Sequence, residues 1–233
     1  MKQVVSFLRE LSLNNERGWF QAHKDDYLEA LERFNAVAEE IIRGIEAFDP
    51  SIRGLGLKDC TYRIYRDLRF SKDKRPYKTH MGVYVCPGGK KSGMAGYYFH
   101  VGTGLEDGYP GSHLLCVGDY RGEREVLRTI REDIEAGGDD FDAAMRSAEG
   151  VGLKLDEDYR MKRMPKGFRE DGPWADYLMY KCYCLIGAVD EDFLFAPNLA
   201  ERVCDVFRST KPFLDFVNRA IGYVQEEKNG GMF

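Results

Sequence analysis

Apolar residues recur at helical spacing near both ends of the chain. At the N-terminal end, Val4, Leu8 and Leu11 are separated by four and three residues, which places them on one face of a helix. Near the C-terminal end, Pro212 is expected to restart a helix, because proline favours the first helical turn. The complete pattern predicts helices near residues 4–11, 16–23, 26–47, 122–136, 141–148 and 199–221.

Alternation of apolar and polar residues predicts strands in the middle of the chain. The two clearest runs, 79–86 and 96–101, are joined by the Gly-rich loop 87–93, so we expect an antiparallel hairpin there. Shorter alternating runs predict further strands at 60–66, 113–117, 153–155 and 180–189.

The predicted hairpin has one polar and one apolar face. The polar face carries two histidines and two tyrosines, His80, Tyr84, Tyr98 and His100. Gly82 lies among them, and a glycine inside a strand marks the close approach of another backbone or of a ligand. We therefore expect either a tightly packed helix or a Tyr/His-lined groove on this face. The apolar face consists of Met81, Val83, Val85, Phe99 and Val101.

The order of these elements predicts the fold class. Helices flank a run of strands, which is typical of an α+β fold in which N-terminal and C-terminal helices pack on an antiparallel or mixed sheet. No repeat, linker or low-complexity stretch divides the chain. We therefore expect a single domain over residues 1–225, followed by a frayed tail at 226–233.

The cysteine pattern and the absence of long apolar stretches indicate the cellular compartment. The six cysteines form no C-x-x-C pair, so we expect free thiols in a reducing compartment. No apolar stretch is long enough to cross a membrane, and the first residues do not read as a signal peptide, so we expect a cytoplasmic protein. The histidines lack metal-ligand spacing, so no metal site is predicted, and no cofactor can be named.

One basic segment, Arg63–Lys78, dominates the charge pattern. It holds seven basic and two acidic residues, whereas the whole chain has a net charge of −5. Such a segment meets either an external anion or carboxylates of the protein itself. Glu16, Asp26 and Glu29 on the predicted N-terminal helices are the internal partners that we considered.

The residue types in this segment suit anion recognition. Arginine presents a planar fork that pairs with carboxylate or phosphate through two hydrogen bonds, and lysine adds a positive field. The expected ligand-binding residues are Arg63, Arg66, Arg69, Lys74 and Lys78, with His80 and Tyr98 on the adjoining sheet face. If the ligand is turned over, the expected catalytic groups are Asp67 as a general base, Tyr77 as a proton donor and His100.

Three functions fit these residues. The first is binding, with or without turnover, of a small phosphorylated or carboxylated ligand. The second is nucleotide or nucleic-acid binding, which basic residues interleaved with aromatic ones favour and the acidic net charge disfavours. A further basic patch at Arg160–Lys166 would extend that footprint. The third is a non-catalytic module that docks an acidic partner. The sequence indicates no membrane partner and does not indicate an oligomeric state.

Several motifs together resemble one protein family. The segment Arg63–Tyr77 reads R-x-x-R-D-x-R-F followed by D-K-x-x-Y, and further matching stretches are Phe7–Leu11, Asn14–Phe20, Tyr97–His100 and Met164–Phe168. These motifs are similar to those of the domain of unknown function 2461 family, which is widespread in bacteria. The resemblance implies a single-domain α+β protein and brings no activity with it.

Overall fold

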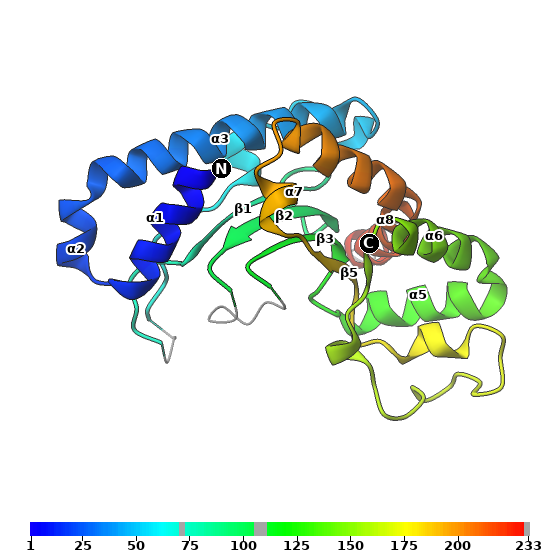
Figure 1. The fold of residues 1–233 in the computed structure, drawn as a ribbon. Helices are drawn as coiled ribbons and strands as arrows, with labels where there is room; N and C mark the ends of the chain where they lie inside the picture. Colours follow the sequence, from blue (N-terminus) through cyan, green and yellow to red (C-terminus); the bar gives the residue numbers. More distant parts are fainter. Residues whose placement is uncertain (70–72, 105–110, 231–233) are drawn as a thin grey trace.

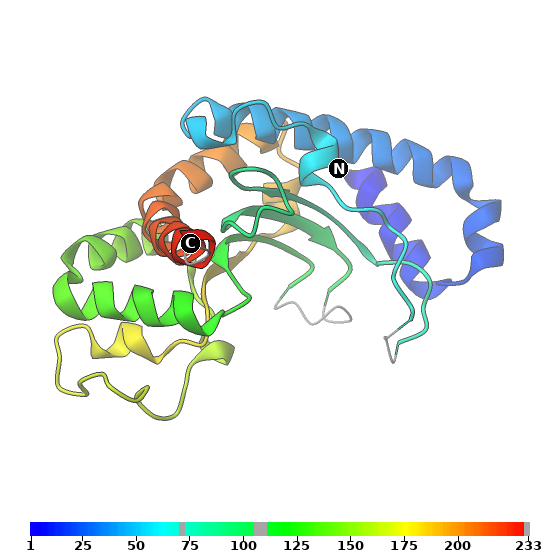
Figure 2. The ribbon, with the colours of Figure 1, turned by 180° about the vertical axis from the view of Figure 1, so that it is seen from behind.

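The computed structural model describes residues 1–69, 73–104 and 111–230, and in this part of the chain an open sheet of five strands carries helices on one face (Figures 1 and 2). The strand order is β1-β2-β3-β5-β4, and each neighbouring pair is antiparallel. The prediction of an α+β fold is therefore confirmed. The strands are β1 (His80–Val85), β2 (Gly96–Gly102), β3 (His113–Asp119), β4 (Lys154–Leu155) and β5 (Tyr183–Ala188).

The helices lie before and after the first three strands, as the sequence predicted. None of those that the structure describes combines the length and apolar character needed to span a bilayer. The α-helices are α1 (Lys2–Leu13), α2 (Arg17–Ala22), α3 (Lys24–Glu46), α4 (Leu57–Cys60), α5 (Arg124–Gly137), α6 (Asp139–Gly150), α7 (Glu191–Leu194) and α8 (Leu199–Gly230). Short 3₁₀ turns are η1 (Pro50–Ile52), η3 (Glu157–Tyr159) and η4 (Ala175–Met179).

The core lies between the sheet and the two longest helices. Phe34 of α3 stacks on Phe99 of β2 with ring centroids 6.4 Å apart, and Phe207 of α8 packs against Tyr97 at 5.2 Å. Burying each side chain of this size contributes about 1.5–3 kcal/mol. The predicted apolar face is confirmed, since all its members are buried: Met81, Val83, Val85, Phe99 and Val101.

Two glycines of the hairpin lie against aromatic rings: Gly82 of β1 against Tyr98 of the neighbouring strand, and Gly102 of β2 against His100 of its own strand. Gly82 pairs with His100, and a Cβ atom on Gly82 would lie 2.5 Å from the Tyr98 hydroxyl. A Cβ atom on Gly102 would lie 2.6 Å from His100 Nε2. We expected Gly82 to admit a helix or a ligand. In the structure it lets the ring of Tyr98 lie across β1.

The strand predicted at 60–66 is wrong. Cys60 ends α4, and Thr61 forms only an isolated bridge with Val83. Asp59 draws the chain into that helix, because its carboxylate accepts a hydrogen bond from the Gly56 amide at 3.1 Å. The alternation of apolar residues from Cys60 onward therefore reflects a helix end followed by an extended segment that leaves the sheet.

The predicted helix restart at Pro212 is also wrong, because α8 runs through this residue without interruption. A proline inside a helix costs about 3 kcal/mol through a lost hydrogen bond and a ring clash. Phe207, Phe213 and Val217 are all fully buried along this helix, and their packing offsets that cost. Residues 226–230 of the expected tail are helical, and its last three residues lie outside the described part of the chain.

Candidate anion-binding arm and sheet face

The described residues of the segment Arg63–Lys78, which are 63–69 and 73–78, are called the basic arm from here on and form a two-stranded ribbon. Tyr65 and Tyr77 form an antiparallel bridge. The Lys78 amide donates to the Ile64 carbonyl at 2.8 Å, and the Arg66 amide donates to the Pro76 carbonyl at 3.0 Å. In both views the arm leaves the sheet on the side away from α3 (Figures 1 and 2). Residues 70–72 lie outside the described part of the chain.

The base of the arm is fixed to the N-terminal helices. Tyr77 is only 2% exposed and stacks on Phe20 of α2 with ring centroids 4.0 Å apart. The Asn15 side chain accepts from the Tyr77 amide at 3.1 Å and donates to its carbonyl at 3.0 Å. Desolvation raises the pKa of the Tyr77 hydroxyl. The predicted role of Tyr77 as a proton donor stays a prediction, while its packing gives it a structural role.

Three arginines of the arm pair with its two aspartates. Asp73 holds Arg66 at 3.0 Å and Arg75 at 2.8 Å, and Arg69 meets both carboxylate oxygens of Asp67. From the sequence, carboxylates on the neighbouring helices were also possible partners of these arginines. The partners observed are Asp67 and Asp73 of the arm itself. Arg66 and Arg69 are therefore distributed over two carboxylates along the ribbon.

The remaining candidate cations of the arm have different settings. Arg63 is exposed. Lys74 is exposed and its ammonium donates to the Leu68 carbonyl at 3.2 Å. Lys78 lies at the base of the arm with its ammonium 5.2 Å from the ring centre of Tyr62. These three cations are therefore spread from the base of the arm toward its tip.

Asp73 should titrate near pH 2 in the folded protein. Hydrogen bonds from Arg75, together with the charge of Arg66, lower the pKa of this carboxyl to about 2. Its ordinary value is about 3.9. A lowered folded pKa stabilises the native arm above pH about 4, and this contribution is lost as the pH falls through the folded value. Carboxyl ¹³C NMR would measure the midpoint.

The matched variants for this titration are Arg75→Gln and Arg128→Gln. The first removes the strongest hydrogen bonds to Asp73 and should move its midpoint upward. The second removes an arginine on α5 that pairs with Glu132, and it should leave the midpoint unchanged. An unchanged midpoint in Arg75→Gln would show that the arm does not hold this ion pair in solution.

The structure brings His80, Tyr98 and His100 together on the polar face of the sheet. The imidazole rings of His80 and His100 stack with centroids 4.7 Å apart. The Tyr98 hydroxyl lies 3.1 Å from His100 Nδ1, and His100 is 2% exposed. This contact follows from the register, since Gly82 pairs with His100 and leaves room for the rings.

Two residues that the sequence analysis did not select lie beside this face. Lys90 in the loop between β1 and β2 places its ammonium 5.7 Å from the ring centre of Tyr62, which also faces Lys78. Tyr62 is 47% exposed. The Lys90 amide donates to the Asp59 carbonyl at 2.9 Å, so the loop folds back on α4. In the sequence, only the predicted hairpin indicated that its loop, and with it Lys90, would lie near the polar face of the sheet.

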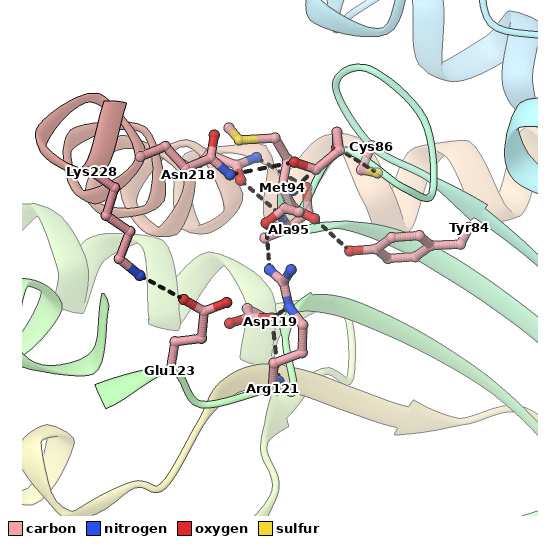
Figure 3. A network of polar contacts seen from close by, with 12 residues as sticks. Tyr84, Cys86, Met94, Ala95, Asp119, Arg121, Glu123, Asn218 and Lys228 are labelled. Carbon is pink, nitrogen blue, oxygen red and sulfur yellow. Dashed lines mark hydrogen bonds and ion pairs between the residues drawn. The ribbon is translucent and has the colours of Figure 1, made fainter. Parts of the chain in front are cut away.

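Helix α8 holds the loop that carries Lys90. Figure 3 shows Asn218 of α8 joined to Ala95, whose amide donates to the Asn218 side chain at 2.8 Å and whose carbonyl accepts from it at 3.1 Å. The Tyr84 hydroxyl donates to the Met94 carbonyl at 2.9 Å. These bonds fix the end of the loop, so the position of Lys90 depends on the C-terminal helix.

The side chains available here are guanidinium and ammonium groups on the arm and phenol and imidazole groups on the sheet face. Across the described ranges, no three His, Cys, Asp or Glu side chains are grouped as metal ligands. All six cysteines are free thiols. The arm can therefore offer guanidinium and ammonium groups to an anion, and the adjoining face can offer phenol and imidazole groups.

Comparison with known proteins places the chain in a family. A family model described as a conserved hypothetical protein, DUF2461, matches residues 3–216. No curated protein and no solved structure matches the chain. The match includes the whole basic arm and the polar face of the hairpin, and it agrees with the resemblance seen in the motifs. The chain therefore belongs to the DUF2461 family of conserved hypothetical proteins.

Proposed function

We propose that the protein binds a phosphorylated or carboxylated ligand through the basic arm and the adjoining sheet face. One observation carries this proposal. In a chain with a net charge of −5, the described part of a single ribbon with a fixed base carries six basic residues and only two acidic ones. Such a concentration of positive charge attracts anions to this part of the surface.

The local ion pairs of the arm leave room for an incoming anion. The Arg69 side chain is 77% exposed and that of Asp67 is 47% exposed. Exposed ion pairs contribute little to stability, because water competes with them. A phosphate can therefore exchange with or add to these aspartates, and its hydrogen bonds with arginine are bidentate and charge-assisted.

The candidate catalytic groups favour binding over turnover. Hydrogen bonds from Arg69 hold the pKa of Asp67 well below its usual range, so this carboxylate is a weak general base at neutral pH. Tyr77 lies in the aromatic core, and burial raises its pKa. His100 is buried beside Tyr98. We therefore propose that His80 and Tyr98 orient the ligand, and we propose no reaction for it.

A thermal-shift measurement with pyrophosphate and citrate tests the proposal at constant ionic strength. A ligand at 100 times its dissociation constant stabilises the folded state by about 2.7 kcal/mol. For a chain of this size that corresponds to a rise in Tm of roughly 5–10 °C. The Arg63→Gln/Arg66→Gln variant should bind at least about tenfold more weakly, a loss of about 1.4 kcal/mol.

The matched control removes two exposed arginines from α5, in the variant Arg124→Gln/Arg128→Gln. It changes the net charge equally and should keep the affinity of the native protein. Equal weakening in both variants would indicate a general charge effect and contradict a site on the arm. The absence of any shift with either anion would also contradict the proposal.

A further inference from the structure

We propose that the ligand of this surface is a single-stranded nucleic acid, lying across the sheet from the basic arm to the segment Tyr159–Lys166. This inference rests on the proposed function, because it places the phosphates of one end of the strand at the arm. It goes beyond that proposal by naming the ligand class and a second half of the site on β4 and β5.

A continuous row of accessible side chains crosses the whole sheet. Tyr84 pairs with Tyr98, Tyr98 with Cys116, Cys116 with Ile186, and Ile186 with Lys154. The first four are half-buried and Lys154 is exposed. Paired residues lie on the same face of a sheet. Four strand spacings of about 4.8 Å give this row a length of about 19 Å.

The opposite face of the same strands is closed by helices. Val83, Phe99 and Leu115, each one residue away from a member of the row, are at most 1% exposed. In Figures 1 and 2 the helices α3 and α8 lie on that side. The exposure of the row therefore does not reflect a loosely packed sheet. It reflects a face that the described helices leave partly open.

The rings in the row are held in place. The ring of Tyr98 lies over Gly82, where a Cβ atom would approach its Cε2 atom to 2.6 Å. One side of this ring therefore rests on β1, and the side chain is half-buried. The hydroxyl of Tyr84 is bound to the Met94 carbonyl. Fixed aromatic rings stack on bases of any sequence, since every base has a π-face.

Cations flank the row at its β1 end. The bridge between Thr61 and Val83 places the next residue, Tyr62, on the same side of the sheet as Gly82. Lys78 and Lys90 both lie over the ring of Tyr62. This end of the row therefore combines an exposed aromatic ring with two ammonium groups, and the basic arm continues from it.

At the other end of the row, beyond β4, an exposed tyrosine again lies close in sequence to exposed basic residues. Tyr159 follows β4 through η3 and is 44% exposed. Its carbonyl accepts from the Lys181 amide at 2.9 Å, which ties it to the start of β5. Lys162 and Arg163 follow and are exposed. In both views this segment and the arm extend from opposite ends of the sheet, away from α3 (Figures 1 and 2).

A row of tyrosine rings with cations at both ends suits the binding of a single-stranded nucleic acid. Its phosphates can meet the cations while its bases stack on the tyrosines. A duplex keeps its bases stacked inside and could use only the cations. The net charge of −5 confines such binding to this surface, because the remainder of the protein repels phosphate.

Fluorescence anisotropy with labelled single strands of about 12 nucleotides, one of deoxythymidine and one of uridine, tests the inference. Three phosphate contacts predict an affinity loss of about 20-fold between about 50 and about 200 mM salt. Tyr98→Leu and Lys154→Gln should each weaken oligonucleotide binding at least about tenfold. Lys154→Gln should leave the pyrophosphate affinity within about twofold of the native protein, because Lys154 lies on β4, at the edge of the sheet far from the arm.

The controls are Tyr223→Leu and Arg128→Gln, which remove an exposed tyrosine from α8 and an exposed arginine from α5 and should change neither affinity. If pyrophosphate binds and the oligonucleotides do not, or if Lys154→Gln binds them as tightly as the native protein, the inference is overturned and the proposed function stands. If neither binds, both are overturned. Equal affinity for a duplex would also overturn the inference.

Discussion

Replacing Phe20 by alanine should lower the free energy of unfolding by about 3–5 kcal/mol, the cost of removing a fully buried phenyl ring. Phe20 is fully buried, and its ring lies 4.0 Å from Tyr77, 5.1 Å from Tyr27 and 5.9 Å from Tyr65. It therefore joins α2 and α3 to the base of the arm. Urea unfolding followed by circular dichroism would measure the change.

The matched control for Phe20→Ala is Leu28→Ala on α3, since Leu28 is 49% exposed. Its effect should stay within about 0.5 kcal/mol, as expected for surface positions. Phe20→Ala should also weaken pyrophosphate binding, because the arm loses the ring on which Tyr77 stacks. A loss below about 1 kcal/mol in Phe20→Ala would mean that the site collapses around the cavity or that the arm is not anchored there.

The second large effect is expected for Gly118→Ala at the end of β3. Gly118 has φ +127°, and a Cβ atom there would lie 2.2 Å from the Tyr183 carbonyl oxygen of β5. The backbone conformation costs an alanine about 1–3 kcal/mol. The overlap with a neighbouring strand costs about 1–3 kcal/mol more, so we expect a loss of about 2–6 kcal/mol. Thermal or urea unfolding measures it.

The substitution Gly222→Ala should stabilise the protein, whereas Gly118→Ala should destabilise it. Gly222 lies inside α8, and a Cβ atom there would meet nothing within 4 Å. Alanine should therefore stabilise the protein by about 0.5–1 kcal/mol, because it loses less backbone entropy in a helix than glycine does. If both variants change stability by similar amounts, the close pairing of β3 and β5 at Gly118 is not as described.

The hairpin could be predicted from the sequence in detail, because its alternation is strict and one face is wholly apolar. A shift of one residue would have turned Val83 and Phe99 to the polar side, so the pattern determined which residues share a face and left the exact pairing open. The contact between the rings of His80 and His100 depends on that pairing, which the structure shows.

Other features depended on information that a local pattern does not contain. The apolar alternation at Cys60–Ile64 is compatible with a strand, but only one of its residues, Thr61, bridges β1. At Pro212 the local preference for a helix start was overridden by the packing of α8 along its whole length. Tertiary burial often outweighs such propensities.

The partners of the arginines could not be predicted either. Asp67 and Arg69 are two residues apart, as are Asp73 and Arg75, and in each pair the arginine amide also donates to the aspartate side chain, so the pairing depends on the local backbone conformation. The accessible row from Tyr84 to Lys154 could not be predicted from the sequence, because it requires the pairing of β3 with β5 and of β5 with β4. Between β3 and β5 the chain forms α5, α6 and β4, and two short 3₁₀ turns lie between β4 and β5.

The most direct test of the binding surface is a pyrophosphate titration of the isotope-labelled protein, followed by NMR at constant ionic strength. The account predicts saturable shifts of the arginine side-chain signals of Arg63 and Arg66 and of the imidazole signals of His80 and His100. Signals of Arg124 and Arg128 on α5 should stay in place. Shifts that spread evenly over exposed arginines, or that never saturate, would contradict a binding site formed by the basic arm and the sheet face.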